Sequence, residues 1–148
     1  MFLKVIRKVS LAVLEDGKML MARSAKHQAV FFTLGGKIEN GETERQALER
    51  EILEECGVGV IEKSIKFLKT FEAPAFGKKN TFVRIQLYSG ELDGQPQASS
   101  EIAELKYFDS SIEPSYLTIT GKLIFKWLKE NNYIIYFNLI SKLKNNRF

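Results

Sequence analysis

The sequence predicts an α/β fold in which a mixed β-sheet is packed between helices, an α/β/α sandwich. Runs of β-branched and aromatic residues with alternating polarity recur along the chain and are typical of strands. Two segments, residues 43–56 and 118–131, instead carry apolar residues at helical spacing. Because 148 residues suffice for one substantial core, we expect a single domain over residues 1–132, followed by a tail, 133–148, with no assigned role.

The first half of the sheet is expected to form around a hairpin. Residues 3–14 are rich in Val, Ile and Leu, and residues 18–23 return after the turn signal Glu15-Asp16-Gly17. A polar loop over residues 24–29 leads to a short apolar run, 30–33, which precedes a glycine turn. These segments predict that several strands precede the central helix in the sequence.

The remaining strands follow that helix. Residues 63–72 alternate in polarity, and residues 73–79 are expected to be a loop. Residues 81–92 alternate almost strictly, so they predict a strand with two distinct faces. A Gly/Pro/Gln/Ser-rich loop, 93–100, then separates this strand from a last one over residues 101–108.

The central helix has clear signals at both ends. The Thr43 hydroxyl can accept a hydrogen bond from an unpaired amide of the first turn, and Gly57 can adopt the conformation that ends a helix. One face is apolar through residues spaced by four: Leu48, Ile52 and Cys56. Cys56 is therefore interpreted as a packing residue.

Three carboxylates share the neighbouring face of this helix. At about 100° per residue, Glu51, Glu54 and Glu55 fall within one sector. Like charges at this spacing cost a few tenths of a kcal/mol per pair. A hard divalent cation, which prefers oxygen ligands, fits this cluster, and a solvated acidic helix face is the alternative.

The stretch from Gly36 to Val58 reads Gly-x5-Glu-x7-Arg-Glu-Ile-x-Glu-Glu-x-Gly-Val, and it resembles the Nudix box at every defining position. The matching residues are Gly36, Glu42, Arg50, Glu51, Ile52, Glu54, Glu55, Gly57 and Val58. The lead-in, residues 34–39, is also similar to the family pattern, except that Leu34 stands where many members carry proline. The family architecture is an α/β/α sandwich, in agreement with the element order.

The resemblance implies a hydrolase that cleaves a nucleoside diphosphate linked to another moiety, X, with Mg²⁺ or Mn²⁺ as cofactor. By motif position, the metal ligands would be Glu51, Glu54 and Glu55, with a backbone carbonyl at Gly35 or Gly36 as a further ligand. Glu51, or an acid outside the box, would act as the base. In addition, Arg50 would orient one of the carboxylates, and Glu42 would pair with Arg50.

Five further residues are interpreted on less specific grounds. The acid outside the box is expected to be Glu101 or Glu104, of which we favour Glu101. Along the strand at residues 81–92, Arg84 and Gln86 project from one face, either toward substrate or toward solvent. Likewise, Phe32 is either a wall of the substrate pocket or a core residue.

The substrate moiety X is not encoded by the box. The short chain resembles small nucleoside triphosphate pyrophosphohydrolases that remove non-standard or oxidised nucleotides, with ADP-ribose or another nucleotide sugar as the main alternative. A nucleotide-sensing module without catalysis is the alternative from another class, and the retention of every box acid argues against it. An RNA-processing role is permitted by the net charge of +4, but no basic stripe with interleaved aromatics supports a nucleic-acid partner.

Composition limits the cellular setting. The single cysteine excludes an intrachain disulfide, and the early charges of the N-terminus do not fit a signal peptide, so we expect a cytoplasmic protein. No apolar run reaches the roughly 18 residues of a membrane span. The tail is expected to pack back on the domain, to pair with a second subunit in a homodimer, or to lie on a membrane surface, in that order.

Overall fold

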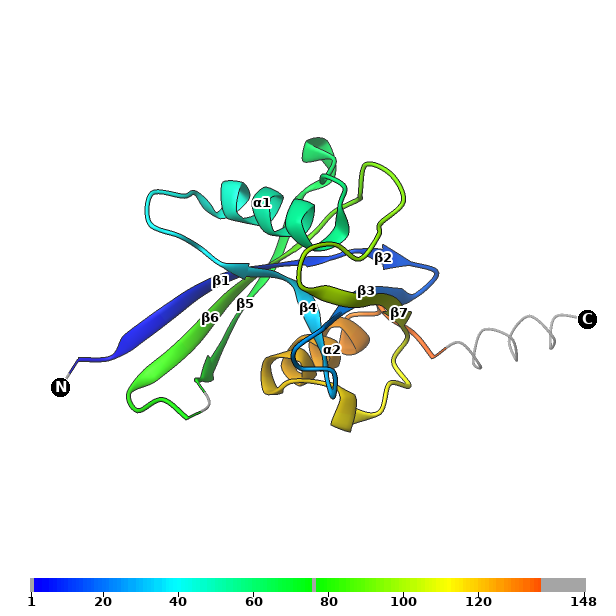
Figure 1. Ribbon diagram of the computed structural model, residues 1–148. Helices are drawn as coiled ribbons and strands as arrows, with labels where there is room; N and C mark the ends of the chain where they lie inside the picture. The colour runs from blue at the N-terminus through cyan, green and yellow to red at the C-terminus, as the bar shows by residue number, and fades with distance from the viewer. Residues whose placement is uncertain (1, 76, 137–148) are drawn as a thin grey trace, which may run out of the picture.

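The computed structural model describes residues 2–75 and 77–136, and it has a mixed β-sheet with one α-helix on each face (Figure 1). The strands are β1 (Lys4–Ala12), β2 (Leu14–Glu15), β3 (Lys18–Ser24), β4 (Phe31–Lys37), β5 (Lys66–Pro74), β6 (Thr81–Ser89) and β7 (Ile102–Phe108). The helices are α1 (Glu44–Cys56) and α2 (Ile119–Glu130), with short 3-10 turns η1 (Glu62–Ser64) and η2 (Pro114–Tyr116). The predicted α/β/α sandwich is therefore confirmed.

Strand β4 joins the two halves of the sheet. The strand order is β2-β3-β4-β1-β6-β5, with β7 paired to β3. The first half of β4 pairs with β3, and its second half pairs with β1. Only the β1–β6 pair is parallel among the strand pairs of the described residues, so the sheet is mixed as expected.

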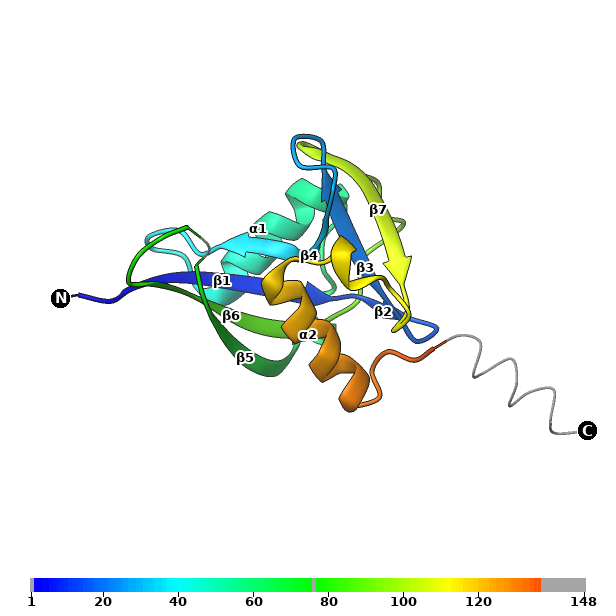
Figure 2. The same cartoon turned by 90° about the horizontal axis from the view of Figure 1, so that it is seen from below.

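Each helix covers its own hydrophobic cluster. Helix α1 packs on one face of the sheet, where Leu48, Ile52 and Cys56 are fully buried. Helix α2 packs on the opposite face, where Ile124 and Leu128 are buried (Figure 2). The apolar stripe predicted for α1 is thus a core contact, and the acids of α1 are left on the adjoining face. The stripe predicted for α2 is core at Ile124 and Leu128, whereas Ile119 and Leu123 are exposed.

Both helix starts are capped by threonine, as the sequence predicts for Thr43. The Thr43 hydroxyl accepts a hydrogen bond from the Gln46 amide at 3.1 Å, and the Gln46 side chain accepts one from the Thr43 amide at 2.9 Å. This reciprocal pair is a capping box. Gly57 ends the helix with a φ of 68°, in the left-handed region.

Several element boundaries differ from the prediction. The glycines expected to form a turn lie inside β4, and the turn falls later, where Gly41 has a φ of 84°. Strand β5 runs on to Pro74, which is tolerated because β5 is an edge strand. Conversely, β6 ends at Ser89 rather than at residue 92, because the chain then diverges and Leu92 pairs with Val60.

The packing of the domain continues beyond residue 132. Ile134 is 1% exposed within the α2 cluster, and Tyr133 stacks on Trp127. The amide of Ile135 donates a hydrogen bond to the carbonyl of Gly17 at 3.0 Å. The first residues of the expected tail therefore belong to the folded domain, whereas residues 137–148 lie outside the described part of the chain.

In the part of the chain that the structure describes, neither helix has the length and apolar character needed to cross a membrane.

Candidate active site

The acid helix approaches β4 closely because Gly36 leaves room for it. A Cβ atom on Gly36 would collide with the carboxylate of Glu51, and one on Gly35 would collide with the backbone carbonyl of Val9. Gly35 also has a φ of 132°, a conformation that residues with a side chain rarely adopt. Gly36 is thus required where β4 meets the carboxylate of Glu51, and Gly35 is required where β4 pairs with β1.

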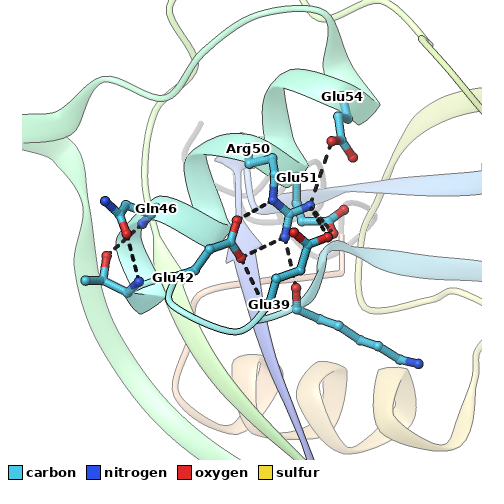
Figure 3. Close-up of polar contacts among 8 residues, drawn as sticks. Glu39, Glu42, Gln46, Arg50, Glu51 and Glu54 are labelled. Atoms are coloured by element: carbon cyan, nitrogen blue, oxygen red, sulfur yellow. Dashed lines mark hydrogen bonds and ion pairs between the residues drawn. The ribbon is translucent and has the colours of Figure 1, made fainter.

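Arg50 is the centre of a carboxylate network (Figure 3). Its Nε and Nη2 atoms donate to the two oxygens of Glu42 at 2.5 and 2.9 Å, in a bidentate pair. Its Nη1 atom donates to Glu51 Oε1 at 2.9 Å, and Nη2 also reaches the carbonyl of Lys37 at 3.1 Å. The guanidinium therefore links the start of the box, the end of β4 and the first box acid of the helix face.

The network shifts the titration of Glu42. The hydrogen bonds from Arg50, with the amide of Glu39 donating a further one, lower the pKa of Glu42 to about 2. The same hydrogen bonds, which Arg50 donates to Glu42, raise the pKa of Arg50 further above its usual range. Both groups are therefore ionised throughout the physiological range, and Arg50 stays available to hold Glu51.

Glu51 and Glu54 differ in exposure. Burial raises the pKa of Glu51, and Arg50 opposes this shift. Glu54 is exposed, and its Oε1 atom lies 3.8 Å from Arg50 Nη1. Both acids of this face thus lie near the same nitrogen, Arg50 Nη1.

Glu55 is the most buried acid of the site, with 7% of its surface exposed. The amide of Gly35 donates a hydrogen bond to Glu55 Oε1 at 2.8 Å. Burial raises the pKa of Glu55 to about 8, and the negative charges of Glu51 and Glu54 add to the rise. A carboxylate in this environment is neutral at pH 7 unless a positive charge is brought to it.

The three acids open on a pocket of about 240 Å³, here called the acid pocket. Its lining consists of Ser24, Phe32, Glu51, Glu54, Glu55, Ser100, Glu101 and Ile102. Phe32, expected to be either a pocket wall or a core residue, packs against the α1 cluster and also lines this pocket. Acidic residues from two separate parts of the chain, helix α1 and the residue just before β7, thus line one cavity.

The two candidate acids outside the box lie in different surroundings. Glu101 lines the acid pocket and makes an exposed ion pair with Lys26 at 3.6 Å. By contrast, Glu104 accepts hydrogen bonds from Arg23 Nε and Nη2 at 3.1 and 2.9 Å and lines a separate pocket. The positions therefore favour Glu101 as the acid that faces the box.

Arg84 and Gln86 lie away from the acid pocket. They project from the α1 face of β6, where Arg84 Nε donates to Glu72 at 2.6 Å. Gln86 bonds Thr70 and lies 3.4 Å from Glu44 at the start of α1. Both side chains contact neighbouring protein groups on the strand surface, and neither lines the acid pocket.

The residues fit a divalent cation by their chemistry. Carboxylate oxygens and a backbone carbonyl at Gly36 are the hard ligands that Mg²⁺ prefers, and Glu55 is a desolvated acid whose charged form needs a positive partner. Within residues 2–75 and 77–136, no three acidic, histidine or cysteine side chains are already grouped as a metal site. Arg50 holds only Oε1 of Glu51, so the second oxygen of this carboxylate remains for a ligand.

Sequence reasoning did not single out several residues of the site. Glu39 bonds Glu42 through its amide and lies 3.9 Å from Arg50, a position that the lead-in pattern signals only weakly. Ser24, at the end of β3, and Ser100, just before β7, line the acid pocket at positions that no spacing rule identifies. Their presence at the site depends on which distant segments of the chain the fold brings together.

Comparison with known proteins identifies the family. The NUDIX domain profile matches residues 5–123. The chain is 29% identical over 117 residues to the NAD-capped RNA hydrolase NudC of Escherichia coli O1:K1 / APEC, covering 78% of this chain and 45% of that protein. The same values hold for the NAD-capped RNA hydrolase NudC of Salmonella heidelberg (strain SL476). The chain thus spans about half the length of the curated relatives it matches.

Solved structures show the same fold. A MutT NUDIX hydrolase from Burkholderia pseudomallei has a TM-score of 0.71 at 19% identity, covering 83% of this chain and 97% of that chain. A putative nudix hydrolase family member from Chromobacterium violaceum has a TM-score of 0.72 at 21% identity, with 99% and 94% covered. The dihydroneopterin triphosphate pyrophosphohydrolase of E. coli has a TM-score of 0.68 at 17% identity, with 88% and 99% covered.

The chain therefore belongs to the NUDIX domain family. The resemblance seen in the sequence is confirmed. Nudix hydrolases act on nucleotide substrates and generally use divalent metal ions such as Mg²⁺.

Proposed function

We propose that this protein is a metal-dependent pyrophosphohydrolase that cleaves the diphosphate linkage of nucleoside diphosphate-X substrates. The observation that carries this proposal is the acid pocket, where three glutamates of one helix share a cavity and one of them, Glu55, is buried against the amide of Gly35. A cluster of this kind is costly without a cation. Mg²⁺ or Mn²⁺ is the cofactor we propose.

The proposed roles follow from position. Glu51, Glu54 and Glu55, with the Gly36 carbonyl, would hold the divalent ion, which neutralises phosphate oxygens and lowers the pKa of water when bound. Arg50 fixes the orientation of the Glu51 carboxylate at 2.9 Å, and Glu42 fixes Arg50 in turn. Glu101, which lines the same pocket, would accept the proton of the attacking water.

For the substrate, we propose non-standard or oxidised nucleoside triphosphates, with ADP-ribose or another nucleotide sugar as the alternative. NAD and NAD-capped RNA enter as further candidates, because the curated relatives that match over 117 residues are NAD-capped RNA hydrolases. All of these substrates share the diphosphate that the acid pocket is suited to. They differ only in the moiety that the rest of the site has to accept.

A substrate screen tests the proposal. Release of pyrophosphate or monophosphate would be followed with Mg²⁺ and with Mn²⁺ for standard and oxidised nucleoside triphosphates, ADP-ribose, NAD and NAD-capped RNA. We expect one class to reach a kcat/KM above about 10⁴ M⁻¹s⁻¹. Omission of the divalent ion should abolish this turnover.

Variants of the acids separate catalysis from folding. Glu54→Gln and Glu55→Gln should each lower kcat by about 10² or more, because an amide is a poor ligand for Mg²⁺. The control is Glu49→Gln, which changes an exposed acid on the same helix and should keep full activity. Full activity in both site variants would rule out the metal assignment, and nucleotide binding without turnover of any substrate would identify a nucleotide-sensing module instead.

A further inference from the structure

A group of lysines lies at the end of the sheet where β1 begins. Figures 1 and 2 show the start of β1 and the turn between β5 and β6 at this end, beyond the start of α2. Three separate segments of the chain contribute a lysine or two each: Lys4 and Lys8 on β1, Lys37 at the end of β4, and Lys78 and Lys79 in the β5–β6 turn. This group is called the lysine patch.

The strand register brings the lysines together. Lys4 and Lys8 are four residues apart on β1, so their side chains leave the same face of the sheet about 13 Å apart. Lys37 lies directly opposite Lys8, and the amide of Lys4 donates a hydrogen bond to the carbonyl of Asn80 in the β5–β6 turn. Burial lowers the pKa of Lys8, and the nearby positive charges of Lys37 and Lys78 lower it further.

The lysine patch has an excess of positive charge. Within the described residues, none of its five lysines forms an ion pair. Glu51 attracts Lys8 and opposes the fall of its pKa, but the carboxylate of Glu51 is itself bonded by Arg50. Because like charges directly opposite each other on a sheet are destabilising, as with Lys8 and Lys37, a polyanion would relieve the repulsion.

The lysine patch leads to the proposed catalytic site. Lys37 directly follows Gly36, which borders the carboxylate of Glu51. Lys8 is half-buried in a recess beside the start of α2, where it lines a cavity with Thr118. A narrow, flexible polyanion can enter such a recess, whereas the flat surface of a bilayer cannot. The geometry therefore favours a strand of nucleic acid over a membrane.

An exposed aromatic ring borders the lysine patch. Phe2 is 97% exposed and stands two residues before Lys4. An aromatic face beside a positively charged surface is a platform on which any base can stack. This ring favours a nucleic acid over inorganic polyphosphate, which has no base to stack.

We propose that the lysine patch binds the phosphate backbone of a single-stranded RNA whose 5′ diphosphate linkage occupies the acid pocket, with Phe2 stacked on a base. This inference rests on the proposed function and narrows its substrate to the RNA-linked candidates. The sequence alone shows no basic stripe, because the lysines come from distant segments that only the pairing of β4, β1, β6 and β5 brings together.

RNA binding without turnover tests the lysine patch. A fluorescein-labelled single-stranded RNA of about 12 nucleotides would be titrated with the full chain in EDTA, and its anisotropy followed at several salt concentrations. The logarithm of the Kd should rise with the logarithm of the salt concentration, with a slope of about 0.7 for each phosphate contact. The double variant Lys78→Gln/Lys79→Gln should raise the Kd about 10-fold at low salt and lower this slope by about 1.4.

The matched control is Lys63→Gln/Lys66→Gln, which removes two exposed lysines at the other end of β5. It changes the net charge by the same amount, so an effect of overall charge would appear equally in both double variants. Its Kd should stay within about twofold of wild type, with an unchanged slope. Equal losses in both double variants, or no RNA binding by the wild-type protein at low salt, would overturn the proposal.

The stacking contact is tested by Phe2→Ala. This variant should raise the Kd for RNA about 5-fold or more without a change in the salt slope, because stacking releases no counterions. Leu3→Ala, which shortens a neighbouring exposed apolar side chain, should change the Kd by less than about twofold. An unchanged Kd in Phe2→Ala would overturn the base contact, and binding to phosphatidylserine vesicles without binding to RNA would identify a membrane surface instead.

The outcomes separate this inference from the proposed function. If small diphosphate substrates are hydrolysed but RNA is not bound, the lysine patch has no such role and the activity stands. RNA binding that depends on Lys78 and Lys79, in a protein that hydrolyses nothing, would support the patch and refute the activity. Folding is checked by thermal unfolding, where Lys78→Gln/Lys79→Gln should keep the Tm of wild type because both positions are exposed.

Discussion

At the scale of single residues, the site depends on how Gly35, Gly36 and Glu55 are placed together. Glu55 is largely removed from water, and its carboxylate accepts a hydrogen bond from the Gly35 amide at 2.8 Å. Removal of water outweighs this one hydrogen bond, so the acid favours its neutral form at pH 7. A divalent ion would reverse this preference, because metal binding to a carboxylate releases its proton.

This leads to a prediction on pH and stability. Between the ordinary pKa of 4.5 and about 8, folded Glu55 keeps a proton that the unfolded chain has lost, so the free energy of unfolding falls as pH rises through this window. We therefore compare the free energies of unfolding of Glu55→Gln and wild type in the absence of divalent ions. The difference, Glu55→Gln minus wild type, should rise by on the order of a few kcal/mol from pH 5 to pH 8.5. Urea denaturation in EDTA at pH 5, 7 and 8.5 measures it.

The control for that measurement is Glu49→Gln, because Glu49 is exposed on the same helix. Its free energy of unfolding should run parallel to that of the wild type over the whole range. If the curves of wild type and Glu55→Gln are also parallel, Glu55 does not carry a raised pKa. That result would also contradict the proposal that metal binding releases a proton from Glu55.

At the scale of elements, α1 is held at its start by side chains of the sheet. Glu44 accepts a hydrogen bond from Tyr88 and lies 3.8 Å from Arg7, so the first turn is tied to β6 and β1. The capping box of Thr43 and Gln46 satisfies further amides of the same turn. Together with Arg50, these contacts set the direction in which the helix presents its acids.

The contribution of the Thr43 cap to the free energy of unfolding can be measured. Thr43→Ala should lower the free energy of unfolding by about 1 kcal/mol, because an amide of the first turn loses its acceptor. Chemical denaturation measures the loss, and Arg45→Ala, at an exposed position in the same turn, should stay within about 0.5 kcal/mol of wild type. Since Glu44 and Arg50 remain, kcat on the substrate found by the screen should change little. A large loss of kcat would show that the cap positions the acids directly.

At the scale of the whole molecule, the two hydrophobic clusters on opposite faces of the sheet make one domain. The cluster under α2 extends past the helix to Ile134, and the backbone of Ile135 bonds the β2–β3 turn at Gly17. Residues that look like a tail in the sequence thus close the core on this face.

The contribution of Ile134 to the free energy of unfolding can be measured. Ile134→Ala should lower the free energy of unfolding by about 2–5 kcal/mol, because a fully buried side chain leaves a cavity. Thermal and urea unfolding of the full chain measure the effect. Ile135→Ala is the matched control, since this side chain is 36% exposed and should cost clearly less. Equal costs would mean that Ile134 adds no core packing.

The sequence by itself determined the family, the element order and the acid helix. The capping signals of Thr43 and Gly57 and the spacing of Glu51, Glu54 and Glu55 are local, and a helix converts spacing directly into a shared face. Strand alternation likewise predicted the faces of β6. These features depend on residues a few positions apart, so no knowledge of distant contacts was needed.

Only the tertiary structure decided which distant residues meet. The continuation of β4 through Gly35 and Gly36, the position of Glu101 rather than Glu104 beside the acids, and the pairing of Lys8 with Lys37 all follow from strand register and loop placement. The burial of Ile134 depends in the same way on α2 and the sheet. Such contacts join residues far apart in the chain, and register between strands is set by the packing of the whole sheet rather than by local sequence.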